Sequence, residues 1–512
     1  MITRIAPQRR RNRGGSRNIL TTLLCMTLLT TLSGCFTWRS PDGGSQATFK
    51  PPRHVNAADI AVPSGYRIEP VATGLTFPTG VAFDDKGGVY VTESGYSYGE
   101  VWDIPRLIRI ERDGGTAVIA EGDNNGPWTG VLFHQDAFYV AEGGALRGGR
   151  ILRITAQGTV TAVVEHLPSM GDHQTNGPAI GLDGALYFGV GTFTNAGVAG
   201  EDNVKFGWLG RFPYRHDIAC RDLTLTGENF QSGNPFTPQD DDTLMTGAFV
   251  PFGTMTSKGQ VIRGSIPCSG AVMRVPLTGG ELELVAWGFR NPFGLEFSPD
   301  GRLFVTDNSY DDRGSRPVQG AGDLLWAVEP GSWYGWPDFH GSRPLNDGDH
   351  FVPPGKPRPT LLLANHPGTP PSPAAVLGVH SSSDGFDFSN NPDFGYVGQA
   401  FVAQFGDQSP TSGKVLAPVG FKVVRVDVTT GVVEEFAVNR GRNNGPASKI
   451  GGGGLERPVA ARFDPTGTAL YIVDFGVMTL GQGGKVRQPW TSSQVAAEPR
   501  KGTGVLWRIT KK

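Results

Sequence analysis

The 512-residue sequence has no long stretch with the apolar period of an amphipathic helix. It also has no basic cluster after residue 35, because 40 basic side chains stand against 48 acidic ones once the six arginines of the first 17 residues are set aside. A mildly acidic domain of this kind argues against nucleic acid as a partner. The chain instead has 74 glycines and 39 prolines, which fits a protein built of turns.

The first 35 residues contain no acidic side chain and are not expected to belong to a fold. Six arginines precede an apolar segment, Ile19 to Leu32, which is too short for a convincing bilayer span and is typical of a secretory signal. The segment ends in Leu32-Ser33-Gly34-Cys35, which resembles a bacterial lipobox. We therefore expect residues 1–35 to be a lipoprotein-type signal with Cys35 lipidated. An ordinary signal peptide with a chance cysteine is the alternative.

Acyl chains on Cys35 would hold the domain on a bacterial membrane by burial of their methylenes, on the periplasmic or cell-surface side. Residues 36–64 are polar and rich in Pro, Gly and Ser, which predicts a flexible tether to a domain spanning 65–512. Beyond Cys35 and Cys25 of the signal, the chain has two cysteines, Cys220 and Cys268. In an oxidising compartment they are a candidate disulfide, and two free buried thiols are the alternative.

One strand–turn–strand unit recurs along the domain. GLEFSPDGRLFVTD (Gly294 to Asp307) aligns without a gap with GVAFDDKGGVYVTE (Gly80 to Glu93) and GPAIGLDGALYFGV (Gly177 to Val190). Looser copies begin at Gly130, Gly385 and Ala460, which makes six. A single hairpin cannot bury its own apolar face, so six copies with further strand pairs between them predict an all-β, six-bladed β-propeller. The competing β-sandwich does not predict six copies of one unit.

Two irregular insertions interrupt the repeats, at about residues 195–269 and 330–373, and the chain closes with GVLWRIT, which is expected to supply an outer strand. In every hairpin the chain enters strand one and leaves strand two at the same end. The residues at these positions are therefore expected to meet around one mouth of the central channel. They are Asp172, His173, Asn176, Arg290, Asn291 and Arg457 before strand one, and Glu93, Glu142, Asp307, Asn308, Gln404 and Asp474 after strand two.

Three segments, GDHQTNGPAIGLDGALYFGVGT, WGFRNPFGLEFSPDG and DLLWAVEPGSWYGWP, resemble the soluble pyrroloquinoline-quinone (PQQ) dependent glucose and sorbosone dehydrogenases. The resemblance extends over roughly Gly65 to Thr510. It implies an exported six-bladed propeller that oxidises an aldose or related sugar on a calcium-bound quinone and passes the electrons to an unidentified acceptor. It also implies that His173 is the base that accepts the hydroxyl proton, for which a neutral imidazole is suited.

The same resemblance implies that Arg290 and Asn291 contact the quinone, with Asn176 and, by position only, Arg457 as further cofactor-binding residues. A guanidinium suits carboxylates because it donates forked, permanently charged hydrogen bonds. For Arg290 the structural alternative is an ion pair with Glu142 or Asp307. Asn308, Ser309 and Tyr310 align with the loop whose backbone carbonyls hold calcium in the family. This loop reads NSYDDRG here, where the glucose enzymes have a Gly-Pro element.

Two other functions fit the sequence. One is a non-catalytic lipoprotein propeller that binds a polysaccharide or a protein partner. The other is a metal-dependent lactonase, with Glu93, Asp307 and Asp474 as ligands of its ion. Quinone binding would distinguish the dehydrogenase from both alternatives. Lactone hydrolysis that a chelator abolishes would identify the lactonase.

Overall fold

The computed structural model describes residues 43–44, 49–95, 103–234, 236–239, 241–409, 412–413, 415–441, 445–480 and 497–512. Cys35 and the predicted signal segment lie outside these ranges, so their roles stay predictions. Within these ranges, no helix has both the length and the apolar character needed to cross a bilayer.

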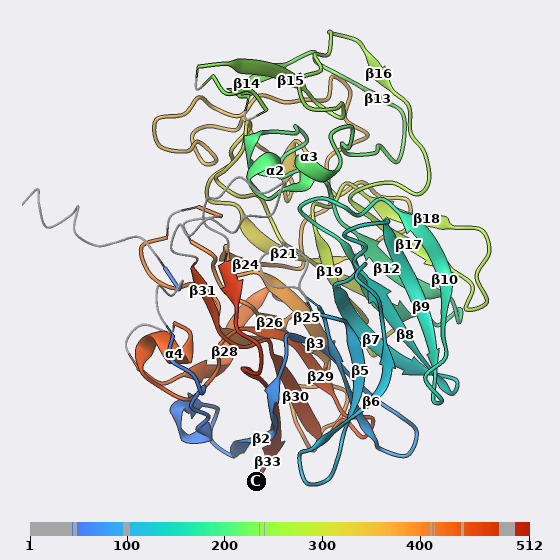
Figure 1. Cartoon of the computed structure of the whole chain (residues 1–512), viewed down its shortest axis with the longest axis vertical. Helices are drawn as coiled ribbons and strands as arrows, with labels where there is room; N and C mark the ends of the chain where they lie inside the picture. The colour runs from blue at the N-terminus through green and yellow to red at the C-terminus, as the bar shows by residue number, and fades with distance from the viewer. Residues whose placement is uncertain are drawn as a thin grey trace, which may run out of the picture. The chain divides into compact units, whose positions relative to one another are not determined.

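The described residues form six antiparallel blades of a β-propeller, as the repeats predict (Figure 1). Blade A contains β3 (Pro78–Phe83), β4 (Val89–Glu93), β5 (Arg106–Ile110) and β6 (Thr116–Glu121). Blade B contains β7 (Trp128–His134), β8 (Ala137–Glu142), β9 (Gly149–Thr155) and β10 (Val160–Leu167). Blade C contains β11 (Thr175–Ile180), β12 (Leu186–Val190), β17 (Ala271–Val275) and β18 (Glu283–Trp287). Blade D contains β19 (Pro292–Phe297), β20 (Leu303–Asp307), β21 (Gly322–Ala327) and β24 (Ala375–Val379).

Blade E contains β25 (Ser383–Phe388), β26 (Ala400–Gln404), β27 (Lys422–Asp427) and β28 (Val432–Asn439), with β1 (Ile60–Ala61) as a fifth strand. Blade F contains β29 (Pro458–Phe463), β30 (Ala469–Asp474), β33 (Gly504–Lys511) and β2 (Tyr66–Leu75). The six hairpins read from the sequence are the first two strands of each blade. The first strands pack against one another in a closed ring, in the order β3, β7, β11, β19, β25, β29 and back to β3.

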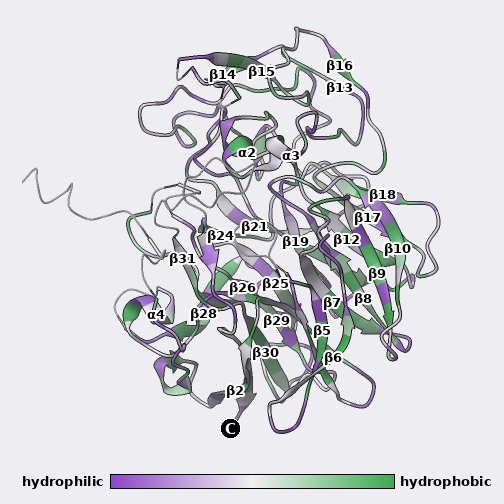
Figure 2. Ribbon diagram, in the orientation of Figure 1, coloured by the Kyte–Doolittle hydropathy of each residue, from purple (hydrophilic) through white to green (hydrophobic). Residues whose placement is uncertain are grey.

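Local sequence explains the hairpins and their burial. In blade D, Ser298 accepts a backbone hydrogen bond from Gly301, and Gly301 has φ +86°, a conformation that glycine adopts without strain. Burial falls from the inner to the outer strands: all six residues of β8 are buried, whereas β10 is mostly exposed. Figure 2 shows hydrophobic residues interspersed with polar ones along the blade strands, and buried apolar side chains of blades A and B pack into one cluster.

Both ends of the domain join in blade F. The C-terminal strand β33 lies between β30 and β2, with Ile509 opposite Ile68 on one side and Leu470 on the other. GVLWRIT therefore completes the last blade, as predicted, but as its third strand and not its outer one, because β2 from the beginning of the domain covers it. Two segments more than 400 residues apart in sequence thus close the ring. The edge of β33 that faces away from β30 is covered by β2.

Part of the predicted tether is folded. After the short helix η1 (Ala57–Asp59), β1 pairs with β28, and Ile60 is 2 % exposed. Arg53 donates hydrogen bonds to the carbonyl oxygen of Thr503 (2.6 Å) and to the carboxylate of Asp474 (2.5 Å). The prediction of a flexible tether is therefore wrong for residues 53–61, which hydrogen-bond to and pair with the propeller.

Both predicted insertions are present. The first, between β12 and β17, contains α2 (Glu201–Lys205), α3 (Trp208–Arg211), β13 (Leu223–Thr224), β14 (Asn229–Gly233), β15 (Thr243–Gly247) and β16 (Val261–Ile262). The second, between β21 and β24, contains β22 (Phe339–His340) and β23 (Arg343–Pro344). The remaining elements are α4 (Ala447–Ile450), β31 (Met478–Leu480) and β32 (Ala497–Pro499). The candidate disulfide is confirmed, because Cys220 and Cys268 are bonded within the first insertion, with Cα atoms 5.1 Å apart.

Reduction of this disulfide is expected to lower the stability of the folded chain. The bond closes a loop of 48 residues, which the chain-entropy account values at about 4 kcal/mol. Thermal unfolding of the protein with and without a reductant, and of a Cys220→Ala/Cys268→Ala double variant, measures the effect. Equal melting temperatures for all three samples would contradict it.

Candidate active site

A cavity of about 220 Å³ opens at the channel mouth, and every blade contributes to its lining. Representative lining residues, in blade order, are Ser94, Thr129, His173, Arg290, Asp384 and Phe475. Six of the eight residues predicted to act on substrate, cofactor or metal line it: His173, Asn176, Arg290, Asn291, Asn308 and Ser309. These six residues therefore lie together at the channel mouth, as the direction of the hairpins predicts, and their roles stay predictions.

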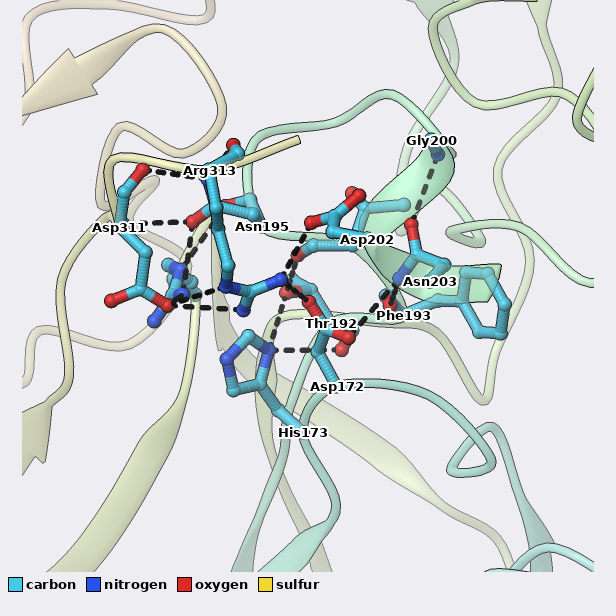
Figure 3. A network of polar contacts seen from close by, with 12 residues as sticks. Asp172, His173, Thr192, Phe193, Asn195, Gly200, Asp202, Asn203, Asp311 and Arg313 are labelled. Atoms are coloured by element: carbon cyan, nitrogen blue, oxygen red, sulfur yellow. Dashed lines mark hydrogen bonds and ion pairs between the residues drawn. The ribbon is translucent and has the colours of Figure 1, made fainter. Parts of the chain in front are cut away.

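His173 lies just before β11 and is 7 % exposed. Its Nδ1 is 3.0 Å from both the carbonyl oxygen and the hydroxyl of Thr192. Because a carbonyl only accepts and the Thr192 hydroxyl donates to the carbonyl of Thr194, Nδ1 carries the proton and Nε2 is an acceptor. Burial lowers the pKa of His173 well below its usual value, and Arg290 and Arg313 lower it further. His173 is therefore a neutral imidazole with a basic nitrogen turned away from Thr192 (Figure 3).

Three amides form a hydrogen-bonded row along the pocket wall. Asn176 Nδ2 donates to Asn291 Oδ1 (3.0 Å), and Asn291 Nδ2 donates to Asn308 Oδ1 (2.8 Å). The row ends where Asn308 Nδ2 donates to the carbonyl oxygen of Ser383 (2.8 Å). Each amide is thereby fixed in one orientation, so blades C, D and E present a preorganised polar wall.

Arg290 is held by several acceptors at once. Its Nη2 donates to Asp311 Oδ2 (2.8 Å) and Asn195 Oδ1 (2.9 Å), its Nε donates to the carbonyl oxygen of Asn195 (3.1 Å), and its Nη1 donates to that of Asn308 (3.1 Å). The ion pair is with Asp311, whereas the expected alternative partners were Glu142 or Asp307. The Asp307 carboxylate instead accepts from the backbone N–H of Arg290.

Arg313 ties three chain segments together next to His173. Its Nη1 donates to Asp172 (2.7 Å) and Asp202 (2.6 Å), and its Nε donates to Asp311 (3.0 Å), as Figure 3 shows. Asp172 precedes β11, Asp202 belongs to α2 of the first insertion, and Asp311 follows β20. Burial, more than the neighbouring Asp202, raises the pKa of Asp172 to about 6. Arg313 therefore fastens the insertion against the loop that carries His173.

The remaining charged groups make the pocket acidic. Its lining has four aspartates, Asp172, Asp311, Asp323 and Asp384, against two arginines. Burial and the nearby Asp323 raise the pKa of Asp384 well above its usual value. Burial alone would lower the pKa of His380, but Asp311 outweighs it and raises that pKa. The opposite part of the lining is apolar, with Phe293, Phe405, Phe475 and Val459.

Arg457 and Tyr310 do not reach the pocket. Arg457 Nη1 donates to the carbonyl oxygens of Gly406 (3.1 Å) and Asp407 (3.3 Å), and its guanidinium packs on the ring of Phe421. In its blade Arg457 has the place of Asn291, immediately before the proline that begins the inner strand. The predicted cofactor contact of Arg457 is therefore not made from this position, because its side chain is buried and does not line the pocket.

The predicted metal loop is also arranged differently. The Tyr310 side chain is 3 % exposed, and its hydroxyl donates to the carbonyl oxygen of Phe339. The carbonyl oxygen of Asn308 accepts from Arg290, so a cation there would lie beside a guanidinium that repels it. The structure therefore disfavours calcium at the Asn308 carbonyl. Among the described residues, no three His, Cys, Asp or Glu side chains gather closely enough to hold a metal.

The acids that end the second strands brace their own blades. Asp307 and Asp474 accept backbone hydrogen bonds from the two residues before their inner strands, and each also accepts an indole N–H, from Trp326 or Trp507. Glu93 accepts from Arg106 and the backbone of Thr76. None of the three lines the pocket, so the lactonase ligand set of Glu93, Asp307 and Asp474 is wrong.

Several pocket residues were missed from the sequence. His380 lies just before β25, which is the position relative to an inner strand that identified His173. The same positional rule would have found it. Asp311 and Arg313 lie in the NSYDDRG loop, and the departure of that loop from the family pattern was the available signal. The hydroxyl of Ser94 had no sequence signal: it is buried, lines the pocket and has no hydrogen-bond partner among the described residues.

No protein-family model matches the sequence, and no curated protein matches it. Solved structures of similar fold do exist. One is the holo form of the PQQ domain of a pyranose dehydrogenase from Coprinopsis cinerea, with 15% identity, a TM-score of 0.50 and coverage of 90% of this chain and 98% of that one. Another is the calcium structure of a Trichoderma reesei protein of Carbohydrate-Active Enzymes Family AA12, with 16% identity, a TM-score of 0.50 and the same two coverages.

A third is the PQQ-bound aldose sugar dehydrogenase of Streptomyces coelicolor, with 15% identity, a TM-score of 0.47 and coverage of 88% of this chain and 99% of that one. The first two likenesses show a shared fold. The resemblance to PQQ-dependent sugar dehydrogenases inferred from sequence motifs is therefore confirmed at the level of the propeller.

Proposed function

We propose that this protein is a sugar oxidoreductase that oxidises a hydroxyl of an aldose or related sugar, with a PQQ-type quinone as the acceptor. The observation that carries the proposal is the state of His173, a neutral base held in one tautomer at the wall of a cavity shared by all blades. The propeller likeness to a pyranose dehydrogenase PQQ domain supports the same class of reaction.

Different residues of the pocket serve different parts of a hydroxyl oxidation. Oxidation breaks the O–H and C–H bonds of the reacting carbon, and Nε2 of His173 is placed to accept the proton. Thr192 keeps the proton on Nδ1, so that the basic lone pair remains on Nε2. The amides of Asn176, Asn291 and Asn308 can orient polar groups of the ligand, because their own geometry is fixed. A bound quinone would supply the acceptor for the hydride.

The pocket fits such a cofactor under one condition. Its apolar wall suits a flat ring, and the unpartnered hydroxyl of Ser94 and the amide row supply hydrogen bonds to polar substituents. A quinone with three carboxylates also brings negative charge to a lining with four aspartates and two arginines. Asn291 and the Nη1 N–H of Arg290 that does not bond Asn308 would contact it, but only together with a dication that offsets the acidic lining.

A titration of the full chain with PQQ tests the proposal. We expect a quinone absorbance change that requires calcium, followed by reduction of an electron-accepting dye when an aldose is added. Calcium dependence is expected because the dication offsets the acidic lining. Failure of the quinone to bind with calcium present would contradict the proposal and favour the alternative of a propeller that binds a polysaccharide or protein. Export and anchoring through Cys35 belong to the same proposal, and mass spectrometry of the mature N-terminus tests them.

A further inference from the structure

Asp311 stands between both arginines of the pocket. Its Oδ2 accepts from Arg290 Nη2 (2.8 Å) and from Arg313 Nε (3.0 Å), and its Oδ1 is 3.5 Å from Nδ1 of His380. Burial alone would raise the pKa of Asp311, but Arg290 and Arg313 hold that pKa well below its usual range. The two guanidinium groups bonded to this carboxylate therefore favour its ionised form.

Most N–H groups of both lining arginines are already paired within the chain. Arg290 donates hydrogen bonds from Nε, Nη1 and Nη2 to Asp311, Asn195 and Asn308. Arg313 donates from Nε and Nη1 to Asp172, Asp202 and Asp311. The forked face that a guanidinium would turn toward a bound carboxylate is thus occupied by the chain's own carboxylate. A sugar acid that takes a forked contact with either arginine would have to break the buried ion pair of that arginine with Asp311, which is costly.

Asp384 makes a useful contrast within the same lining. It is 3 % exposed, and its hydrogen-bonding groups are the hydroxyl of Ser382 (3.3 Å) and the amide of Asn308, with no arginine in contact. Asp311 and Asp384 are thus both buried carboxyl groups of one cavity, but Asp311 alone of the two pairs with the guanidinium groups. Replacing either by an amide removes one carboxyl group from the lining, whereas replacing Asp311 also breaks its ion pairs with two arginines.

We propose that Asp311 is an internal counter-ion that withholds the forked faces of Arg290 and Arg313 from sugar carboxylates, so that the pocket selects uncharged sugars over sugar acids. The inference rests on the proposed function, because it names the substrate class of that site. Uncharged hydroxyl groups can still bind the amide row and His173, since neither depends on a free cation. Asp311 is accordingly a specificity-determining residue.

The test uses two ligands that differ at one group and cannot be oxidised at the anomeric carbon, methyl glucoside and methyl glucuronide. Calorimetric titration of the full chain, with calcium and PQQ present, measures the affinity of each. For the wild-type protein we expect the glucuronide to bind at least about ten-fold more weakly than the glucoside. Lowering the salt concentration should not strengthen its binding, because no free guanidinium is there to attract it.

For Asp311→Asn we expect glucuronide affinity to rise about ten-fold or more, and glucoside affinity to stay within a factor of about three, which also shows that the pocket remains folded. Asp384→Asn, the same substitution in the same lining but away from the arginines, is the control and should gain clearly less. Equal gains in both variants, no gain in Asp311→Asn, or equally tight binding of the two glycosides by the wild-type protein would overturn the inference. The wild-type comparison decides the matter if a variant does not fold.

The result of the glycoside titration can be distinguished from success or failure of the proposed sugar oxidation. If PQQ does not bind but the protein discriminates between the glycosides as described, the oxidation proposal fails and the role of Asp311 stands. If PQQ binds and oxidation occurs but the two glycosides bind equally tightly, the oxidation proposal stands and the role of Asp311 is wrong. If no form binds either glycoside, the pocket is not a sugar site and the role assigned to Asp311 is wrong.

Discussion

His173→Ala is expected to lower the rate of sugar oxidation by about 10²- to 10⁴-fold while quinone affinity stays nearly unchanged. The reason is that Nε2 faces the cavity as a proton acceptor, and no other neutral base among the described lining residues has a tautomer fixed in the same way. Dye-coupled rates and a quinone absorbance titration on the same samples separate the two effects. Loss of quinone affinity in step with the rate would mean that His173 holds the cofactor.

The pH profile gives a second measurement on the wild-type protein. Burial lowers the pKa of His173 well below its usual value, so the imidazole is already deprotonated near pH 6. The rate should therefore not fall as the pH is lowered from 8 to 6. A half-maximal rate near pH 6.5 would show an ordinary solvated histidine and count against this assignment.

Arg290→Gln serves as the contrasting variant. Its guanidinium lies between Asn195, Asn308 and Asp311 at the pocket wall and is not placed to move the substrate proton. Replacing it should weaken quinone binding first and lower the rate only through incomplete loading. Rates at saturating quinone would then approach the wild-type value. If both variants behave like the wild-type protein, the site is assigned wrongly even though the fold is right.

The sequence predicted the architecture because its signal is local. Each hairpin carries its own turn residues and strand period, as Ser298 to Gly301 illustrates, and six copies leave few ways to bury six apolar faces. The position of His173 also follows from chain direction alone, since an antiparallel hairpin returns both ends to one side. These inferences need no knowledge of which side chains meet across the ring.

The sequence did not predict which charges pair, because partners come from distant segments. Arg313 meets Asp202 only because the first insertion folds back over the loop before β11, and nothing near either residue signals this. Arg457 shares the position of Asn291 but turns to backbone carbonyls that blade E supplies. Likewise, the polar stretch before Tyr66 resembles a tether by composition, yet Arg53 finds buried acceptors in blade F.

Replacing Arg313 should have the largest effect on stability of any single change at the site. It is the one side chain that bonds Asp172, Asp202 and Asp311 together, and all four are largely buried. Removing one partner of a buried ion pair leaves uncompensated charge and typically costs about 3–5 kcal/mol. Urea unfolding of Arg313→Gln at pH 8 measures this loss. Arg302→Gln is the matched control, because the exposed pair of Arg302 with Asp300 is worth about 1 kcal/mol or less.

The stability lost in Arg313→Gln should also depend on pH, and the pKa of the Asp172 carboxyl determines the direction of this dependence. Burial raises its pKa to about 6, so the folded protein holds this proton more tightly than the unfolded chain does. The group therefore favours folding at low pH, and its contribution falls as the pH rises from about 4 through about 6. Without Arg313 the pKa rises further, because the cation that stabilised the charged form is gone. Arg313→Gln should thus recover part of its stability between pH 8 and pH 5, and an equal loss at both pH values would show that the three carboxylates do not share this arginine.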